Sequence, residues 1–140
     1  MKFPALITLT FSLVLGLSTA SADVIGERKA NFRKNVDALK AINTAIPEGD
    51  HAAVAAAASV VANWSRDMTA FFPKGSDEGD TKARPEIWME WEKFVSLAKN
   101  AEDSALALAQ LAKAGNAEAL PGALNTLGAS CKACHNSFKY

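Results

Sequence analysis

Apolar residues recur at intervals of three and four along most of the chain, which is the period of an amphipathic α-helix. The first helix is predicted over residues 24–46, and the turn residues 47–49, Pro-Glu-Gly, end it. Its apolar stripe consists of Ile25, Phe32, Val36, Leu39, Ile42 and Ile46. No stretch alternates apolar and polar residues, so the pattern predicts helices and no strands.

A second helix is predicted after Asp50, because aspartate commonly caps a helix N-terminus. Its apolar face consists of Val54, Ala57, Val61, Trp64, Met68 and Phe71. Residues 73–84 follow this helix. They are rich in glycine and charge and have no helical period, so we expect a surface loop.

A third helix is predicted to begin at Pro85, since proline suits the first helical position. Glu86 next to it suits the positive end of the helix dipole. The apolar positions of this helix are Ile87, Trp91, Phe94, Ala98, Ala101, Ala105, Leu108 and Leu111. Gly115 is the expected C-cap.

The start of a fourth helix is ambiguous. Asn116 could cap it, but Pro121 would then lie inside the helix, where proline removes a hydrogen bond. The helix therefore either begins nearer Leu120 or has a distorted first turn. Four amphipathic helices joined by short turns and one longer loop predict an all-α fold, an antiparallel four-helix bundle.

Residues 1–22 differ from the rest of the chain. A single charge at Lys2, a long apolar run and the exit sequence Ala20-Ser21-Ala22 are typical of a secretory signal peptide. A membrane anchor is the alternative, but a span needs about 20 apolar residues, and a proline and a glycine interrupt this shorter run. We therefore expect cleavage after Ala22, one domain over residues 23–140, a periplasmic location and no membrane contact after cleavage.

The charge balance limits the partners of the mature chain. The sequence holds 15 basic and 15 acidic residues, and cleavage would remove only Lys2 from that count. A protein that binds nucleic acid usually has a basic excess, so nucleic acid is not an expected partner. A nearly neutral chain also has no general attraction to acidic membrane surfaces.

The chemistry lies near the end of the chain. The apolar stripe of the last helix is Leu120, Leu124, Leu127, Cys131, Cys134 and Phe138, so both cysteines face the core. With His135 they form the Cys-x-x-Cys-His sequence of c-type haem attachment. Two thiols three residues apart on a helix can reach the two vinyl groups of one porphyrin, and His135 is then the proximal iron ligand.

A disulfide, a redox site and a zinc site each account for less of this sequence. A plain disulfide leaves His135 unexplained, and a redox Cys-x-x-Cys site normally begins a helix after a strand. A zinc site needs four ligands, whereas the only other histidine is His51 and no further cysteine exists. We therefore expect one covalently attached haem c, near one end of the bundle.

Two segments resemble the cytochrome c′ family, and the resemblance covers essentially all of the mature chain. Residues 128–135, Gly-Ala-Ser-Cys-Lys-Ala-Cys-His, are very similar to the family's haem segment. Residues 82–88, Lys-Ala-Arg-Pro-Glu-Ile-Trp, are similar to its third-helix entry, with Phe94 six residues later as in the family. The resemblance implies a four-helix bundle with its haem on the last helix, and it includes Trp88 and Phe94 among the cofactor-binding residues.

The resemblance also assigns roles to other residues around the haem. It implies that Arg28 lies beside a haem propionate and that Phe32, four residues later, stands over the open face of the iron. Lys139, four residues after His135, corresponds to a basic residue on the proximal side. Met68 occupies roughly the place where some members have a tryptophan against the haem. From the pattern alone, Phe32 and Met68 are ordinary core residues.

Phe32 decides between two functional interpretations. Relatives of the cytochrome c-556 type have methionine at this position and use its sulfur as sixth ligand, whereas phenylalanine has no lone pair to give. The resemblance therefore implies a five-coordinate, high-spin iron under an apolar ring, which excludes anions and water but admits NO and CO. The alternative is a low-spin, six-coordinate electron-transfer cytochrome of the c-556 type, in which Met68 or Lys29 closes the sixth position.

The remaining expectations concern activity and assembly. An enzyme such as a peroxidase needs a distal base or a polar pocket, and His51 has no reason to lie over the haem, so no enzymatic turnover is expected. The sequence does not identify a redox partner protein. A homodimer through the first two helices is a further expectation of the resemblance, although Lys34, Lys40 and Arg66 would oppose close approach.

Overall fold

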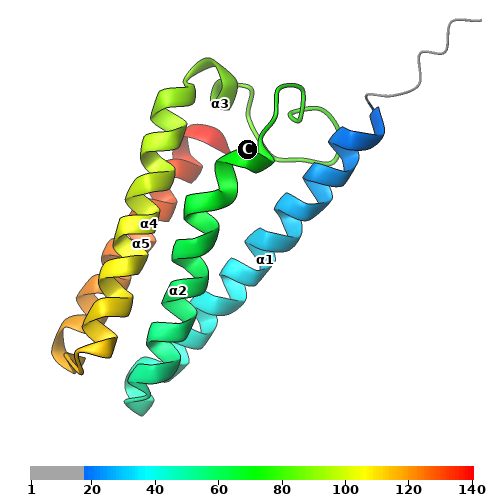
Figure 1. Cartoon of the computed structure of the whole chain (residues 1–140). Coiled ribbons are helices and arrows are strands. Elements are labelled where there is room, and N and C mark those ends of the chain that lie inside the picture. The colour runs from blue at the N-terminus through cyan, green and yellow to red at the C-terminus, as the bar shows by residue number, and fades with distance from the viewer. Residues whose placement is uncertain (1–17) are drawn as a thin grey trace, which may run out of the picture.

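The described part of the chain is a bundle of four long helices with three short helical segments at their ends (Figure 1). The computed structural model describes residues 18–140, with side chains from residue 23. The predicted signal peptide, residues 1–22, thus lies outside the described residues apart from the backbone of residues 18–22. The long helices are α1 (Ser18–Glu48), α2 (His51–Asp67), α4 (Trp91–Lys113) and α5 (Leu120–Phe138). The short ones are η1 (Met68–Phe71), α3 (Glu86–Met89) and η2 (Ala117–Ala119).

The predicted all-α, antiparallel four-helix bundle is confirmed. In the part of the chain that the structure describes, no strand is longer than a single bridge, between Ala83 and Lys139. The loop before α3, the end of α2 and the end of α5 all lie at one end of the bundle (Figure 1). Among the described helices, none is long and apolar enough to cross a membrane.

The turn between α1 and α2 forms as the sequence predicts. Gly49 adopts a φ of 72°, a left-handed conformation that glycine reaches without strain, and this reverses the chain. Asp50 then accepts a hydrogen bond from the Ala53 N–H at 2.9 Å, which confirms it as the N-cap of α2. The helix α1 is longer than predicted, because its last turn includes Pro47 and runs to Glu48.

The prediction of one uninterrupted third helix is wrong. Glu90 has φ −117° and ψ 45°, which separates the short helix α3 from α4. A hydrogen bond anchors α3 to the preceding loop. The indole Nε1–H of Trp88 donates to the carbonyl of Phe72 at 3.0 Å. Pro85 lies at the N-cap of α3, one position before its expected place.

The start of the fourth helix is settled in favour of Leu120. Gly115, with φ 71°, ends α4, and Asn116 caps only the short helix η2, accepting from the Ala119 N–H at 3.3 Å. The helix α5 begins at Leu120 and has Pro121 in its first turn. Proline has no N–H to contribute there, but the first turn would leave that N–H unpaired in any case.

Two clusters of buried side chains fill the bundle. The alanine-rich core consists of Ala38, Ile42, Ala45, Val54, Ala55, Ala58, Val61, Ala62, Ala105, Leu108, Ala109, Ala112, Leu120 and Leu127. The aromatic core consists of Trp64, Met68, Phe72, Ile87, Phe94, Ala98 and Phe138. Two predicted core positions are instead on the surface: Val36 is 51 % exposed, and Trp91, the first residue of α4, is 39 % exposed. On α1, Ala38 and Ala45 take the buried positions, because small residues let the helix lie close to α2.

The N-cap of α2 offers a direct test of the turn. We expect Asp50→Ala to lower the free energy of unfolding by about 1 kcal/mol, since the Ala53 N–H loses its acceptor. Urea unfolding followed by circular dichroism measures the change. The control Asp50→Asn keeps an oxygen at the cap and should retain most of the stability; equal losses in both variants would contradict a capping role.

Candidate functional site

The predicted haem-attachment residues lie on α5, one of the two helices that border the loosely packed side of the bundle. The pairs α1 and α2, α2 and α4, and α4 and α5 are in close contact, whereas the backbones of α1 and α5 make at most a few contacts. A four-helix bundle with three tight helix pairs has its fourth side available for a group other than a helix.

Cys131 and Cys134 are half-buried on the inner face of α5, and no disulfide joins them. Cys131 packs against the alanine-rich core and Cys134 against the aromatic core, so the two cysteines mark the level at which the cores meet. Burial raises the pKa of the Cys131 thiol, and burial together with the neighbouring Cys131 raises the pKa of Cys134 to about 11. Both thiols therefore keep their protons at neutral pH.

His135 follows directly on the same helix. Partial burial, and after it the nearby ammonium of Lys139, lower the pKa of its imidazole below the ordinary value. The neutral imidazole, which has a lone pair for a metal, is thus the main form at neutral pH. Lys139 ends the helix, and its backbone N–H donates to the His135 carbonyl at 3.1 Å, so the structure brings these two predicted residues together.

Arg28 is the most deeply buried charged residue of those described, with 3 % of its surface exposed. Its terminal nitrogens donate to four oxygens: Phe71 O (3.3 Å), Ser76 Oγ (3.2 Å), Ser76 O (2.9 Å) and Thr81 Oγ1 (2.7 Å). The guanidinium also lies over the Phe72 ring, 4.3 Å from its centre. These contacts fasten α1 to the loop that follows η1.

The charge of Arg28 has no counter-ion within the described part of the chain. All four acceptors are neutral, and none of the ion pairs found among these residues includes Arg28. Burial lowers the pKa of Arg28 from its ordinary value, but a guanidinium remains protonated in proteins. A buried cation is stabilised by a nearby anion, so this residue suits a cofactor that carries carboxylates, as the propionates of a haem do.

Of the two residues predicted near the open face of the iron, Met68 is part of the aromatic core and Phe32 packs against it. Phe32 is half-buried and meets Trp64 edge to face, with ring centres 5.2 Å apart. Met68 is 5 % exposed and begins the short helix η1. Cys134 packs against the same core from α5, so the structure brings all three residues into one cluster.

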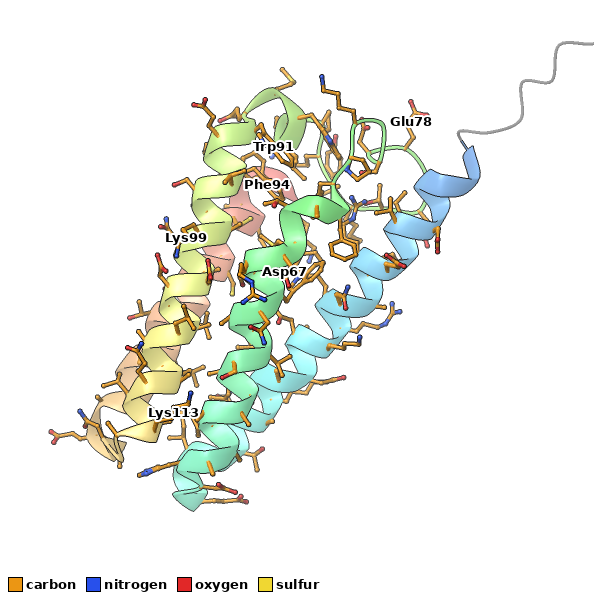
Figure 2. The ribbon with its side chains drawn as sticks, viewed as in Figure 1. Asp67, Glu78, Trp91, Phe94, Lys99 and Lys113 are labelled. Atoms are coloured by element: carbon orange, nitrogen blue, oxygen red, sulfur yellow. The ribbon has the colours of Figure 1, made fainter. Side chains whose placement is uncertain are left out.

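Phe94 and Trp88 lie at the α3–α4 side of this cluster. Phe94 is 2 % exposed and points from α4 into the end of the bundle (Figure 2). It contacts Phe72 and Phe138, with ring centres 4.8 and 5.5 Å away. Trp88 packs against the aromatic core from outside and donates its indole N–H to the loop carbonyls of Phe72 and Pro73.

Two residues considered as alternatives lie elsewhere or are engaged. Lys29 pairs with Asp80 on the loop, which occupies its ammonium group. His51 begins α2 at the opposite end of the bundle, where its Nδ1 is near Gly115. Neither position supports a role as iron ligand or distal base.

Asn35 was not among the site residues predicted from the sequence. It lies on α1 between Phe32 and Leu39, and its Oδ1 is shielded from solvent without a hydrogen-bond partner among the described residues. The signal was present in the pattern, because Asn35 is a polar residue at a position where the apolar stripe of the first helix continues.

Comparisons with known proteins agree with this arrangement. The protein-family model described as Cytochrome C' matches residues 23–139. A cytochrome c′ from Rhodospirillum rubrum is 33 % identical over 113 residues, covering 79 % of this chain and 73 % of the relative. A cytochrome c-556 from Agrobacterium fabrum is 31 % identical over 142 residues, covering 94 % of each.

Solved structures match in the same way. A cytochrome c′ described as having a ligand-controlled dimer dissociation superposes with a TM-score of 0.78 at 31 % identity, covering 89 % of this chain and 98 % of that one. A nitric oxide complex of a cytochrome c′ variant from Alcaligenes xylosoxidans has a TM-score of 0.75 at 28 % identity, covering 85 % and 94 %.

Arg28 can be tested independently of any function. We expect Arg28→Ala to lower the free energy of unfolding by about 3 kcal/mol, because buried oxygens of the loop lose their donor. Arg28→Lys should lose less, since one ammonium can replace some but not all of the four bonds. Urea unfolding and limited proteolysis within residues 73–84 measure the effect; a loop that stays resistant in Arg28→Ala would show that other contacts hold it.

Proposed function

The chain belongs to the cytochrome c′ family, and we propose that it is an exported haem protein whose five-coordinate iron binds small uncharged gases such as NO and CO. Its cofactor is a c-type haem, as in that family. Transfer of electrons to a partner protein is compatible with the same cofactor. The observation that carries the gas-binding proposal is Phe32, a side chain without a lone pair in the cluster that also includes Cys134.

We assign the attachment of the haem to three residues of α5. The sulfurs of Cys131 and Cys134 would form the two thioether bonds, and the imidazole of His135 would bind the iron, which supplies the gas-binding position. Three features support the assignment: the half-buried thiols lie on α5, which borders the side where α1 and α5 do not pack together, the imidazole is neutral at neutral pH, and the motif spacing is that of haem c.

The residues around the cluster would shape the pocket. Arg28 would neutralise a propionate, in agreement with its buried charge, which has no counter-ion among the described residues. Phe32 would cover the open face of the iron, and Met68, Trp88 and Phe94 would contact the porphyrin or support residues that do. Lys139 would border the proximal side, close to His135.

A low-spin electron-transfer cytochrome is the second candidate function. The match to a cytochrome c-556 over 94 % of this chain favours it. It requires a protein side chain as sixth ligand. Met68 would have to leave the aromatic core, where it is only 5 % exposed, and Lys29 would have to leave Asp80. Both changes cost packing or an ion pair, so the five-coordinate interpretation is preferred.

An enzymatic role is not part of the proposal. A haem peroxidase needs a polar distal group to cleave its substrate bond. The imidazole of His51 is at the far end of the bundle, and Phe32 is apolar. These placements support a protein that binds or carries a ligand without converting it.

Export and dimer formation complete the proposal. The signal peptide predicted for residues 1–22 would direct the chain to the periplasm, and the family match begins at the residue after the expected cleavage.

A homodimer through α1 and α2 is supported by the exposed Val36 and Val60 on these helices. The charges expected to oppose it are partly balanced, because Lys40 pairs with Asp37 and Arg66 with Asp67.

An absorption spectrum of the purified protein tests the proposed function. We expect a broad high-spin band in the ferrous state that shifts on addition of CO, since no side chain would occupy the sixth position. Sharp, split bands that do not respond to CO would instead establish a low-spin iron and the electron-transfer function.

Replacement of Phe32 tests the residue over the iron. We expect Phe32→Met to convert the iron to low spin and to suppress CO binding, because the thioether sulfur supplies the missing lone pair. Phe71→Met is the matched control: Phe71 also contacts Trp64, with ring centres 5.2 Å apart, but from η1. A Phe32→Met protein with the wild-type spectrum would remove Phe32 from the distal face.

A further inference from the structure

We propose that Asn35 is a polar residue of the haem cleft, where its carboxamide forms a hydrogen bond with the small molecule that the cleft admits. The inference rests on the proposed gas-binding function and deepens it, because it names a residue that selects among ligands. The observations that carry it are the position of Asn35 on α1 and the unmet hydrogen bond of its Oδ1.

The position of Asn35 is set by the residues on either side of it. Phe32 precedes it by three residues and Leu39 follows it by four, so the three side chains share one face of α1. Phe32 packs against the aromatic core, as Cys134 does, and Leu39 packs against the alanine-rich core, as Cys131 does. Asn35 therefore lies at the level where the two cores meet, which is the level of the attachment motif on α5.

The hydrogen-bonding state of Asn35 is unusual for this face of the helix. Its Oδ1 is shielded from water and has no partner in the described part of the protein. A buried polar atom without a partner destabilises a fold, and such atoms are rare in native proteins. An apolar residue of the same size would avoid this cost. The unmet bond therefore points to a partner that the polypeptide does not supply.

Trp64, which contacts Phe32, has a second polar group without a hydrogen-bond partner among the described residues. Its Nε1–H is also shielded from solvent and has no acceptor among the described residues. The Trp64 ring meets the Phe32 ring edge to face, with ring centres 5.2 Å apart. Four such shielded atoms occur in the described side chains, and the other two belong to the Arg84–Glu86 ion pair at the start of α3. The surroundings of Phe32 thus contain one unmet acceptor and one unmet donor, from two different helices.

The chemistry of a carboxamide fits more than one ligand. Its oxygen accepts from water, and after rotation about the last side-chain bond its NH₂ group donates to a ligand that can only accept, such as NO or CO. A cleft lined by Phe32 alone would admit small uncharged molecules according to size. A cleft with Asn35 beside Phe32 also retains longer those molecules that accept a hydrogen bond.

The test uses the haem-loaded protein and its CO complex. We expect Asn35→Leu to raise the C–O stretching frequency, because a donor to the ligand oxygen weakens the C–O bond and the variant lacks that donor. CO binding should weaken about three- to tenfold, the equivalent of one ordinary hydrogen bond. Asn35→Ala, which cannot clash, should give the same shift if the leucine variant does not fold.

Asn31→Leu is the matched control. Asn31 is one turn earlier on α1 and lines a surface groove with Lys34, Trp64 and Asp67. Its Oδ1 already accepts from the Lys34 ammonium on the exposed surface, so its replacement should leave the C–O frequency unchanged. If all three variants have the wild-type frequency and affinity for CO, the inference is overturned. A structural role alone would change the unfolding midpoint and not the frequency.

A second readout separates failure of the inference from failure of the proposed function. In the nitrogen–proton NMR spectrum, the side-chain amide signals of Asn35, assigned by their loss in Asn35→Leu, should be displaced by the haem far more than those of Asn31. Displaced signals in a protein that does not bind CO would reject the gas-binding function but retain Asn35 in the cleft. Ordinary amide shifts in a protein that binds CO would reject the inference and retain the function.

Discussion

Alanine at the helix contacts lets α2 lie close to both α1 and α4, and the rest of the structure depends on this close packing. Helix separation is set by the side chains between the axes. Ala45, Ala55 and Ala58 allow a short distance towards the α1–α2 turn, whereas Phe32, Trp64 and Phe71 fill the space at the other end. The helix α1 accordingly diverges from α2 towards the loop end (Figure 1). Both cysteines of the attachment motif lie on α5, which does not pair closely with α1.

A buried cation stabilises the end at which the helices separate. Arg28 projects from α1 into the loop and donates four hydrogen bonds to it, so the loop is fastened to the helix that has the fewest close neighbours. The second attachment of the loop is the bond from Trp88 to Phe72, and the third is the bridge from Ala83 to Lys139 at the end of α5. The aromatic core is therefore enclosed from three sides, and the unbalanced charge of Arg28 suits a cofactor with carboxylates.

The functional interpretation depends on a small number of side chains in this enclosed region. Phe32 favours an open iron position, because it has no lone pair to give and the buried Met68 could give one only with loss of packing. Asn35 makes the same face of α1 less apolar than the resemblance to the family implied. A pocket with one aromatic ring and one carboxamide would combine exclusion by size with selection by hydrogen bonding, and the two properties can be separated by mutation.

Local rules in the sequence determined much of this protein. Periodicity identified the four long helices, Asp50 and Gly49 identified the first turn, and the spacing of Cys131, Cys134 and His135 identified the cofactor, because caps and thioether motifs depend on residues close in sequence. The break at Glu90, the surface position of Val36 and the unmet bond of Asn35 were decided only by the tertiary structure. Each depends on a partner distant in the chain or on the lack of one. Trp88 donates a hydrogen bond to Phe72, Val36 remains exposed, and the Asn35 Oδ1 finds no donor among the described residues. A one-dimensional pattern assigns residues to helix faces, but it does not specify which face another helix will cover.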